Sequence, residues 1–188
     1  MIHINVATNS KKVRAYLSFL SDSAVSTASA RALNKTVSTT ATAANKEIRL
    51  VYNVRAVAIR KAMKIKRAHK KQKSLRAEIV VRGSRIGLIE FQARWTRRMP
   101  GTSVKVKVQG PRKTVKGAFI ATNSHSGYRG VFRRVGKSRY PIVNLRSISL
   151  PFAFFNEAVI TATSKVAAEA YAKNYEHELQ YILNTRKF

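Results

Sequence analysis

The residues best suited to do chemistry in this chain are lysine and arginine, whose partners would be negatively charged. Between Arg31 and Leu150 the sequence holds 30 Lys or Arg residues and only three acids, Glu47, Glu78 and Glu90. The net charge of this segment is +27, almost all of the +29 of the 188-residue chain. A charge of this size destabilises a compact protein by self-repulsion unless counter-charges are close. We therefore expect a folded, positively charged body that works against a polyanion, which would be nucleic acid, an acidic protein surface or anionic lipid.

The residue patterns that would support catalysis are incomplete. Gly136-Lys137-Ser138 ends like a phosphate-binding loop, but the position that such a loop reserves for its first glycine is Val131. Asp22 is the only aspartate, and three acids in the basic segment are too few for the carboxylate cluster of a metal-dependent nuclease. The four histidines are scattered, without a pair at metal-ligand spacing. The sequence therefore predicts no enzymatic activity, no cofactor and no metal.

The basic residues can instead bind a polyanion directly. Lys and Arg neutralise phosphates and release counterions, which gives an affinity that is independent of sequence and sensitive to salt. The same charges could align an acidic protein partner, and the sequence does not separate these two alternatives. The candidate contacts to DNA or to an acidic partner are Lys64, Lys66, Arg67, Lys70, Lys71, Arg94, Arg97, Arg98, Arg112, Lys113, Lys116, Arg129, Arg133, Arg134, Lys137 and Arg139.

Aromatic residues accompany three of the basic loops, at 94–98, 112–116 and 129–139. Such side chains could stack unpaired bases. They could equally be core residues at the ends of strands, and this second interpretation is the one we expect. The aromatic residues concerned are Trp95, Phe119, Tyr128, Phe132 and Tyr140.

Length and composition are those of a folded protein. With 188 residues, 45% of them hydrophobic, the chain can bury one ordinary core or two small ones. The absence of cysteine excludes disulfides and zinc fingers. No stretch approaches 18 uninterrupted apolar residues, and the first residues lack the pattern of a signal peptide. We therefore expect no membrane-spanning helix and synthesis in the cytoplasm.

The elements that carry these residues begin with helices. Residues 11–51 have apolar positions at helical spacing in two pieces, with Ser10 as a cap and a break at 21–23. We expect the stripe of the second piece to pack on the chain's own core, with contact to another subunit as the alternative. A shorter helix, basic on one side, is expected from Asn53 to Arg67. The stripe consists of Val25, Ala28, Ala32, Val37, Ala41, Ala44, Ile48 and Val51.

From Leu75 the hydrophobic period changes to two, which indicates strands. The clearest alternation is that of valine and lysine over 104–108. After Tyr140-Pro141 the pattern is irregular until Pro151. The expected strands are 75–82, 86–95, 104–108, 117–122 and 131–134.

A final helix is expected over 151–184, because Pro151 suits its first position and apolar residues recur at helical spacing. This helix holds half of the acids of the chain, Glu157, Glu169, Glu176 and Glu178. The predicted fold is α+β, with long N-terminal helices over 11–67, a small antiparallel sheet in the basic region 75–134 and a long C-terminal helix. We expect a single domain over residues 1–188.

The stretch from Lys116 to Pro151 carries a family pattern. Its residues Gly117-Ala-Phe-Ile120, Val131-Phe-Arg-Arg-Val-Gly-Lys-Ser-Arg-Tyr-Pro-Ile142 and Ile148-Ser-Leu-Pro151 resemble the prophage minor tail protein Z family. This is the tail completion protein of lambda-type phages with long, non-contractile tails. Upstream, Arg31-Ala-Leu-Asn-Lys-Thr36 and Ile59-Arg-Lys-Ala-Met-Lys-Ile65 support the resemblance, which covers roughly residues 25 to 160.

The resemblance implies a virion structural protein at the head-proximal end of the tail, which lets tails join heads and deliver DNA. It implies no catalysis and no cofactor, and we expect neither a membrane nor a small-molecule substrate as a partner. The implied partners are the tail terminator protein, the end of the tape measure protein and the leading end of the DNA, with a homo-oligomeric ring as the expected assembly. The Ala-rich helix and the acid-bearing final helix are the candidates for subunit contacts.

Two alternatives to a tail completion protein remain. The first is a sequence-nonspecific nucleic-acid-binding protein unrelated to virions, which the charge and the aromatic residues alone would support. The second is a small nuclease, which would require cleavage dependent on a divalent ion.

Overall fold

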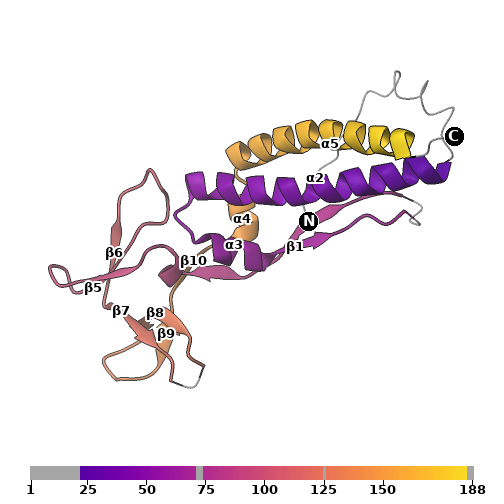
Figure 1. Ribbon diagram of the computed structural model, residues 1–188. Helices are drawn as coiled ribbons and strands as arrows, with labels where there is room; N and C mark the ends of the chain where they lie inside the picture. Colours follow the sequence, from indigo (N-terminus) through magenta and orange to yellow (C-terminus); the bar gives the residue numbers. More distant parts are fainter. Residues whose placement is uncertain (1–21, 71–73, 125, 186–188) are drawn as a thin grey trace. The chain divides into compact units, whose positions relative to one another are not determined.

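The computed structural model describes residues 22–70, 74–124 and 126–185. These residues form a long N-terminal helix, small antiparallel sheets in the middle of the sequence and a long C-terminal helix (Figure 1). The predicted α+β fold class is therefore confirmed. The helical piece expected over 11–21, with its cap at Ser10, lies outside the described residues, and so does Lys71.

The chain divides into two compact units. The helical unit contains residues 1–44, 63–81 and 157–188, and the β-rich unit contains residues 45–62 and 82–156. Helix α2 (Asp22–Val51) contributes to both units, because residues up to Ala44 belong to the helical unit and the rest to the β-rich unit.

The helical unit is built on α2 and α5 (Glu157–Thr185), which lie side by side (Figure 1). The two helices are antiparallel, because contacts at later positions of α2 fall on earlier positions of α5. Ala24 and Ala28 of α2 pack with Ile182 of α5. Small side chains at these positions allow the two helices to approach closely.

The apolar stripe of α2 is covered by the chain itself. Val37 and Ala41 pack with Ile79. The partly buried side chains of Met63, Ala77 and Val81 pack against this cluster. Ala28, Ala32 and the other central members of the stripe are buried as well. The expectation that the stripe packs on the chain's own core is confirmed.

The hairpin consists of β1 (Met63–Lys66) and β2 (Glu78–Val81), paired antiparallel. The helix predicted from Asn53 to Arg67 is therefore wrong in its second half, since α3 (Ala56–Ala62) ends where β1 begins. Pairing with β2 turns Met63 towards the cluster on α2, and this contact overrides the local helical pattern. The strand expected over 75–82 is confirmed for 78–81.

The β-rich unit contains two three-stranded sheets, in the orders β4-β5-β6 and β7-β8-β9, and a pair formed by β3 and β10. All of these pairings are antiparallel. The short helix α4 (Leu150–Phe154) follows β10 directly. The strands are β3 (Arg85–Gly87), β4 (Arg94–Thr96), β5 (Gly101–Val104), β6 (Lys113–Lys116), β7 (Ala118–Thr122), β8 (Arg129–Arg134), β9 (Ile142–Asn144) and β10 (Arg146–Ser149).

Two strand predictions in this unit are wrong. The strand expected over 86–95 is interrupted by a 3-10 turn, η1 (Leu88–Glu90), and by Gln92, whose φ is 50°. This interruption lets Phe91 turn into the core, where it is completely buried. The strand expected over 104–108 ends at Val104, because the residues after it bond to the end of α2 and the chain that follows it: the Val108 amide donates to the Val51 carbonyl at 3.0 Å, and the Asn53 amide donates to the Val106 carbonyl at 2.8 Å.

The predictions for residues 117–184 are confirmed only in part. The strands at 117–122 and 131–134 are confirmed as β7 and β8, whereas the region expected to be irregular before Pro151 contains β9 and β10. The final helix is divided, because α4 ends at Phe154 and α5 begins at Glu157. Phe152 and Phe155, which fall within the segment expected to form one long helix, are each 60% exposed.

Candidate functional site

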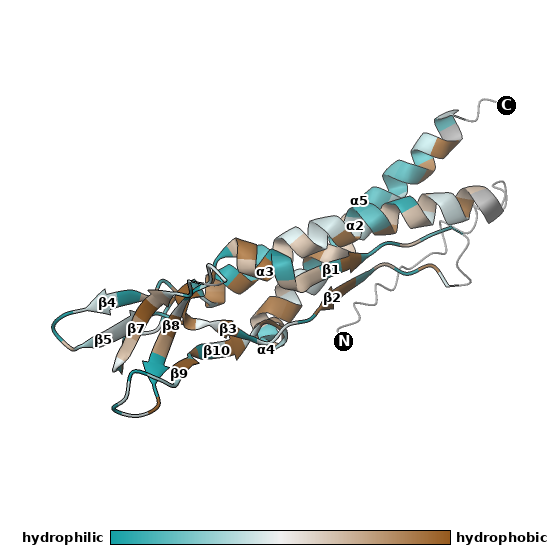
Figure 2. Cartoon of the chain, turned by 90° about the horizontal axis from the view of Figure 1, so that it is seen from below, coloured by the Kyte–Doolittle hydropathy of each residue, from teal (hydrophilic) through white to brown (hydrophobic). Residues whose placement is uncertain are grey.

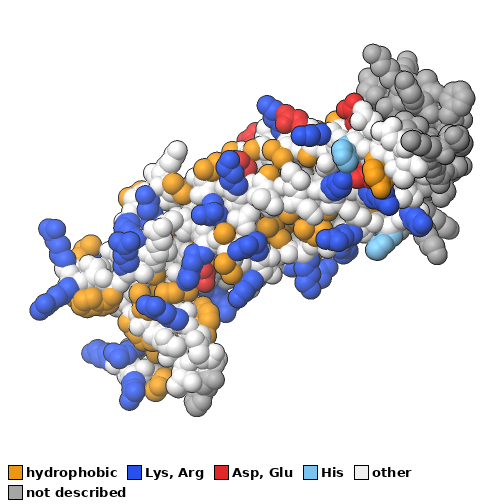
Figure 3. Space-filling model, viewed as in Figure 1, with side chains coloured by type: hydrophobic (Ala, Val, Ile, Leu, Met, Phe, Trp, Pro, Cys, Tyr) orange, Lys and Arg blue, Asp and Glu red, His pale blue; other side chains and the backbone are white. Residues whose placement is uncertain are grey.

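The two units differ strongly in charge. By sequence the β-rich unit has 21 Lys or Arg residues and two acids, a net charge of +19, while the helical unit has 16 and six, a net charge of +10. Figure 3 shows the face of the molecule on which Lys and Arg side chains are frequent and acids are few.

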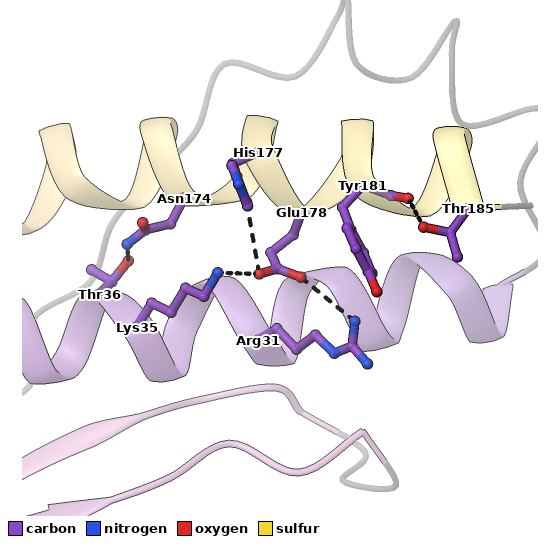
Figure 4. A network of polar contacts seen from close by, with 8 residues as sticks. All are labelled: Arg31, Lys35, Thr36, Asn174, His177, Glu178, Tyr181 and Thr185. Carbon is purple, nitrogen blue, oxygen red and sulfur yellow. Dashed lines mark hydrogen bonds and ion pairs between the residues drawn. The ribbon is translucent and has the colours of Figure 1, made fainter.

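In the helical unit a buried acid is paired with basic side chains. Glu178 of α5 is only 4% exposed, and its carboxylate forms ion pairs with Arg31, at 3.7 Å from Nη1, and with Lys35 (Figure 4). The Nδ1 atom of His177 lies 4.0 Å from the same carboxylate. Burial of an ionised carboxylate is unfavourable unless it is paired and hydrogen-bonded. These contacts therefore hold α5 against α2.

The segment Arg31–Thr36, part of the family pattern, makes further contacts of this kind. The Asn34 side chain accepts from the Ala68 amide at 2.8 Å and donates to the Ala68 carbonyl at 3.0 Å. The Thr36 hydroxyl accepts from the side-chain amide of Asn174 at 3.1 Å (Figure 4). This segment thus fastens both α5 and the chain that follows β1 to α2, a role that we did not predict.

Some candidate contacts fall in the helical unit. Lys64, Lys66, Arg67 and Lys70 lie on β1 and immediately after it. Lys66 is paired with Glu78 at 3.2 Å, and Arg76 lies 3.3 Å from the same carboxylate. Lys66 therefore already has an acidic partner within the chain, which it shares with Arg76.

The larger group of candidates lies on the β-rich unit, and all of its members are exposed. Of the two acids in this unit, Glu90 is paired with Arg55 at 2.8 Å. From Phe91 to Asn156 the sequence has 14 Lys or Arg residues and no acid. The end of β8, where two of the candidates lie, is coloured hydrophilic in Figure 2. Around β4-β5-β6 lie Arg94, Arg97, Arg98, Arg112, Lys113 and Lys116, and on β8 and the following loop lie Arg129, Arg133, Arg134, Lys137 and Arg139.

Arg112 differs from the other members of this group. Its guanidinium group donates to the Gln92 carbonyl at 2.8 Å and to the Ser103 carbonyl at 3.4 Å. These bonds tie the positive-φ turn at Gln92 to β5. Arg112 therefore has a structural task in addition to its charge.

A hollow of about 600 Å³ lies on one face of the β7-β8-β9 sheet. The rings of Phe119 and Phe132, a cross-strand pair, line it with their centroids 6.3 Å apart. The guanidinium group of Arg134 lies 5.6 Å from the Phe119 ring, and that of Arg139 lies 5.8 Å from the Tyr140 ring. The hollow therefore combines aromatic faces with positive charge, a combination that suits flat or anionic ligands.

The expectation that the aromatic residues belong to the core is wrong. Tyr140 is 66% exposed and Trp95 is 58% exposed, while Phe119 and Phe132 are half-buried on the hollow. The physical reason is strand alternation, since the opposite face of β7 and β8 carries the buried residues, among them Val131. Sequence reasoning missed Ala121 and Ile142, which also line the hollow, because only the strand register brings them there.

These features define a basic α+β protein. Ion pairs and hydrogen bonds hold its two long helices together, and one of its sheets carries aromatic rings and positive charge on its surface. The model of the prophage minor tail protein Z (GPZ) family matches residues 11–187. The chain therefore belongs to this family of phage tail structural proteins, which confirms the resemblance seen in the sequence and indicates a location in the tail of the virion. No match was found among curated proteins or among solved structures.

Two further observations concern metal sites and membrane-spanning helices. Within the described ranges, no group of three His, Asp or Glu residues is arranged to hold a metal ion. Among the helices that the structure describes, none is long and apolar enough to cross a membrane.

Proposed function

We propose that this protein completes the head-proximal end of a phage tail, so that the tail joins the head and delivers DNA, and that it acts without catalysis. The observation that carries the proposal is the family match over nearly the whole chain, since the family is one of minor tail proteins. The proposed partners are the tail terminator protein, the end of the tape measure protein and the leading end of the DNA, in a ring of several copies.

The division of charge between the units supports distinct tasks. The exposed cations of the β-rich unit far outnumber its two acids, so that the negative partner has to come from outside this unit. DNA or an acidic tail protein would supply it, and phosphates would release counterions on binding. The helical unit pairs several of its cations internally, so fewer of them are available to an external negative partner.

Deletion of the gene from the phage tests this proposal. We expect filled heads and tails of normal length, seen by electron microscopy, with a loss of infectious titre that the wild-type gene restores in trans. A normal titre would contradict the proposal, and so would the complete absence of tails.

A matched pair of charge variants sharpens the test. Replacement of Arg129 and Arg133 by Gln removes two exposed charges from the β-rich unit, and replacement of Lys165 and Lys173 by Gln removes two exposed charges from α5. The first pair should fail to restore the titre fully, whereas the second should restore it. Equal titres would show that the charge of the β-rich unit has no special task.

The exposed rings on the β-rich unit favour a second candidate, a sequence-nonspecific nucleic-acid-binding protein that acts outside the virion. Mass spectrometry of purified particles separates the two functions. A tail completion protein is present in mature virions, whereas the second candidate is absent from them and binds DNA with an affinity that falls as salt rises. Cleavage of plasmid DNA in the presence of magnesium would instead indicate a nuclease.

A further inference from the structure

We propose that the hollow on the β7-β8-β9 sheet binds unpaired bases of single-stranded DNA. The inference deepens the proposed function, on which it rests for the presence of DNA beside this unit. It concerns one defined place on the β-rich unit, where three aromatic rings and two guanidinium groups lie together.

The first argument is the display of the rings on a sheet surface. Phe119 and Phe132 occupy paired positions on neighbouring strands, with ring planes inclined by 35°, and Tyr140 lies at the rim. Aromatic side chains on the face of a small sheet are a common platform for unpaired bases, because every base presents a flat π surface. Base pairs inside a duplex do not expose these surfaces, so the hollow should distinguish single strands from duplex.

The second argument is the small size of the residues beside the rings. Ala121 lines the hollow, and its cross-strand partner is Gly130. A Cβ atom on Gly130 would lie 2.7 Å from Cε1 of Tyr128 and 3.0 Å from Cζ of Phe132. Because glycine lacks this atom, the Phe132 and Tyr128 rings can both lie close to β8 at this position.

The third argument is the charge around the hollow. Arg134 and Arg139 place their guanidinium groups near the rings, and no acid occurs in the sequence from Phe91 to Asn156. Phosphates of a strand whose bases lie on the rings would meet only positive charge from this segment. An acidic peptide would satisfy the arginines but would leave the ring faces without flat partners, so the observations favour nucleic acid.

The rim indicates what selectivity to expect. Thr122, Asn123 and Ser124 line one side of the hollow, and each has a small polar side chain that can donate or accept a hydrogen bond. Stacking on aromatic rings is tolerant of sequence. We therefore expect binding of single strands with little preference among bases.

Fluorescence anisotropy with the full-length protein tests the inference. The probes are a labelled oligothymidylate of about 16 nucleotides, a length at the upper end of such sites, and a blunt duplex of the same length. For Tyr140→Ala we expect about a tenfold loss of affinity for the single strand and a change of less than about twofold for the duplex. The conservative variant Tyr140→Phe should bind the single strand like the wild type, because the ring is kept.

Two further variants exclude trivial causes. Phe155 is 60% exposed in the same unit and does not line the hollow, so Phe155→Ala should leave both affinities unchanged. Ala121→Leu puts bulk into the hollow without a change of charge, and it should weaken single-strand binding at unchanged salt dependence. Thermal unfolding of each variant verifies that the fold is intact, and Tyr140→Ala remains the decisive variant because its side chain is exposed.

Three outcomes would overturn the inference. Tyr140→Ala would leave single-strand binding unchanged, or it would weaken single strand and duplex equally, or a polyglutamate peptide would bind more tightly than the oligonucleotide and would itself depend on Tyr140. None of these results affects the deletion test of tail completion. Conversely, absence of the protein from virions would refute the proposed function and leave single-strand binding intact.

Discussion

The helical unit and the β-rich unit differ in how their acids pair with basic side chains. In the helical unit Glu178 and Glu78 each pair with two basic side chains, and Glu178 does so while almost completely buried. In the β-rich unit the sheets carry many exposed cations, and the one acid seen in an ion pair, Glu90, serves Arg55. The comparison indicates that the acids of the helical unit offset part of its positive charge within the unit, whereas the β-rich unit has only two acids to offset its 21 basic residues.

The cores of the units differ as well. The buried positions of α2 in the helical unit are mainly Ala and Thr, which permit close approach of helices. The β-rich unit buries larger side chains, of which Phe91 is the largest that is completely enclosed. The stability of the helical unit should therefore depend on ion pairs and hydrogen bonds more than that of the β-rich unit does.

The largest expected effect comes from the core of the β-rich unit. Phe91→Ala should lower the free energy of unfolding by about 3–5 kcal/mol, because it removes a completely buried ring and leaves a cavity. The control is Trp95→Ala in the neighbouring strand, which should cost about 0.5 kcal/mol or less because the ring is exposed. Denaturant unfolding measures both, and similar losses would show that Phe91 does not anchor this core.

A smaller effect is expected from the fastening of the helical unit. Glu178→Gln should lower the free energy of unfolding by about 1–2 kcal/mol, since charge-assisted bonds to Arg31 and Lys35 are lost while those half-exposed partners remain solvated. Glu176→Gln, at an exposed position of α5, should have almost no effect. If both variants unfold alike, the buried ion pairs do not fasten α5.

The smallest expected effect is a difference in pH dependence. Burial, with a smaller contribution from the neighbouring Tyr175, raises the pKa of the Tyr171 phenol. A raised pKa means that the folded state favours the neutral phenol, so this contribution to stability is complete below about pH 10 and is lost as the pH rises through the shifted value.

Tyr171→Phe removes this group, and its melting temperature should therefore fall less steeply than that of the wild type as the pH rises above about 10. Tyr181→Phe, at an exposed position, is the control and should follow the wild type. Parallel curves for Tyr171→Phe and the wild type would refute the effect.

Much of the fold could be predicted because the information is local. The Ala stripe of α2 repeats at helical spacing, and β7 and β8 are separated by a Gly- and Ser-rich loop that marks a hairpin. The strand β1 could not be predicted in this way, because Met63–Lys66 continues a helical pattern and becomes extended only through pairing with residues 78–81. Likewise, the turn at Gln92 interrupts an alternating pattern so that Phe91 can be buried.

The candidate site could likewise be predicted only in part. The basic residues and the five aromatic residues were recognisable by type, yet their grouping depends on which residues face each other across β7, β8 and β9. Glu178 could not be chosen among the four acids of the C-terminal helix, because its burial follows from the packing of α5 on α2. Side-chain type was therefore informative about chemistry, and register and packing decided which residues act together.

The most direct test of the external negative partner is a cryo-electron microscopy map of the intact head–tail junction of the phage. Our account predicts density for this chain at the head-proximal end of the tail, with the β4-β5-β6 and β7-β8-β9 sheets of the β-rich unit facing DNA or an acidic tail protein. A map in which this chain is present and its β-rich unit faces solvent, or in which the chain is absent, would contradict it.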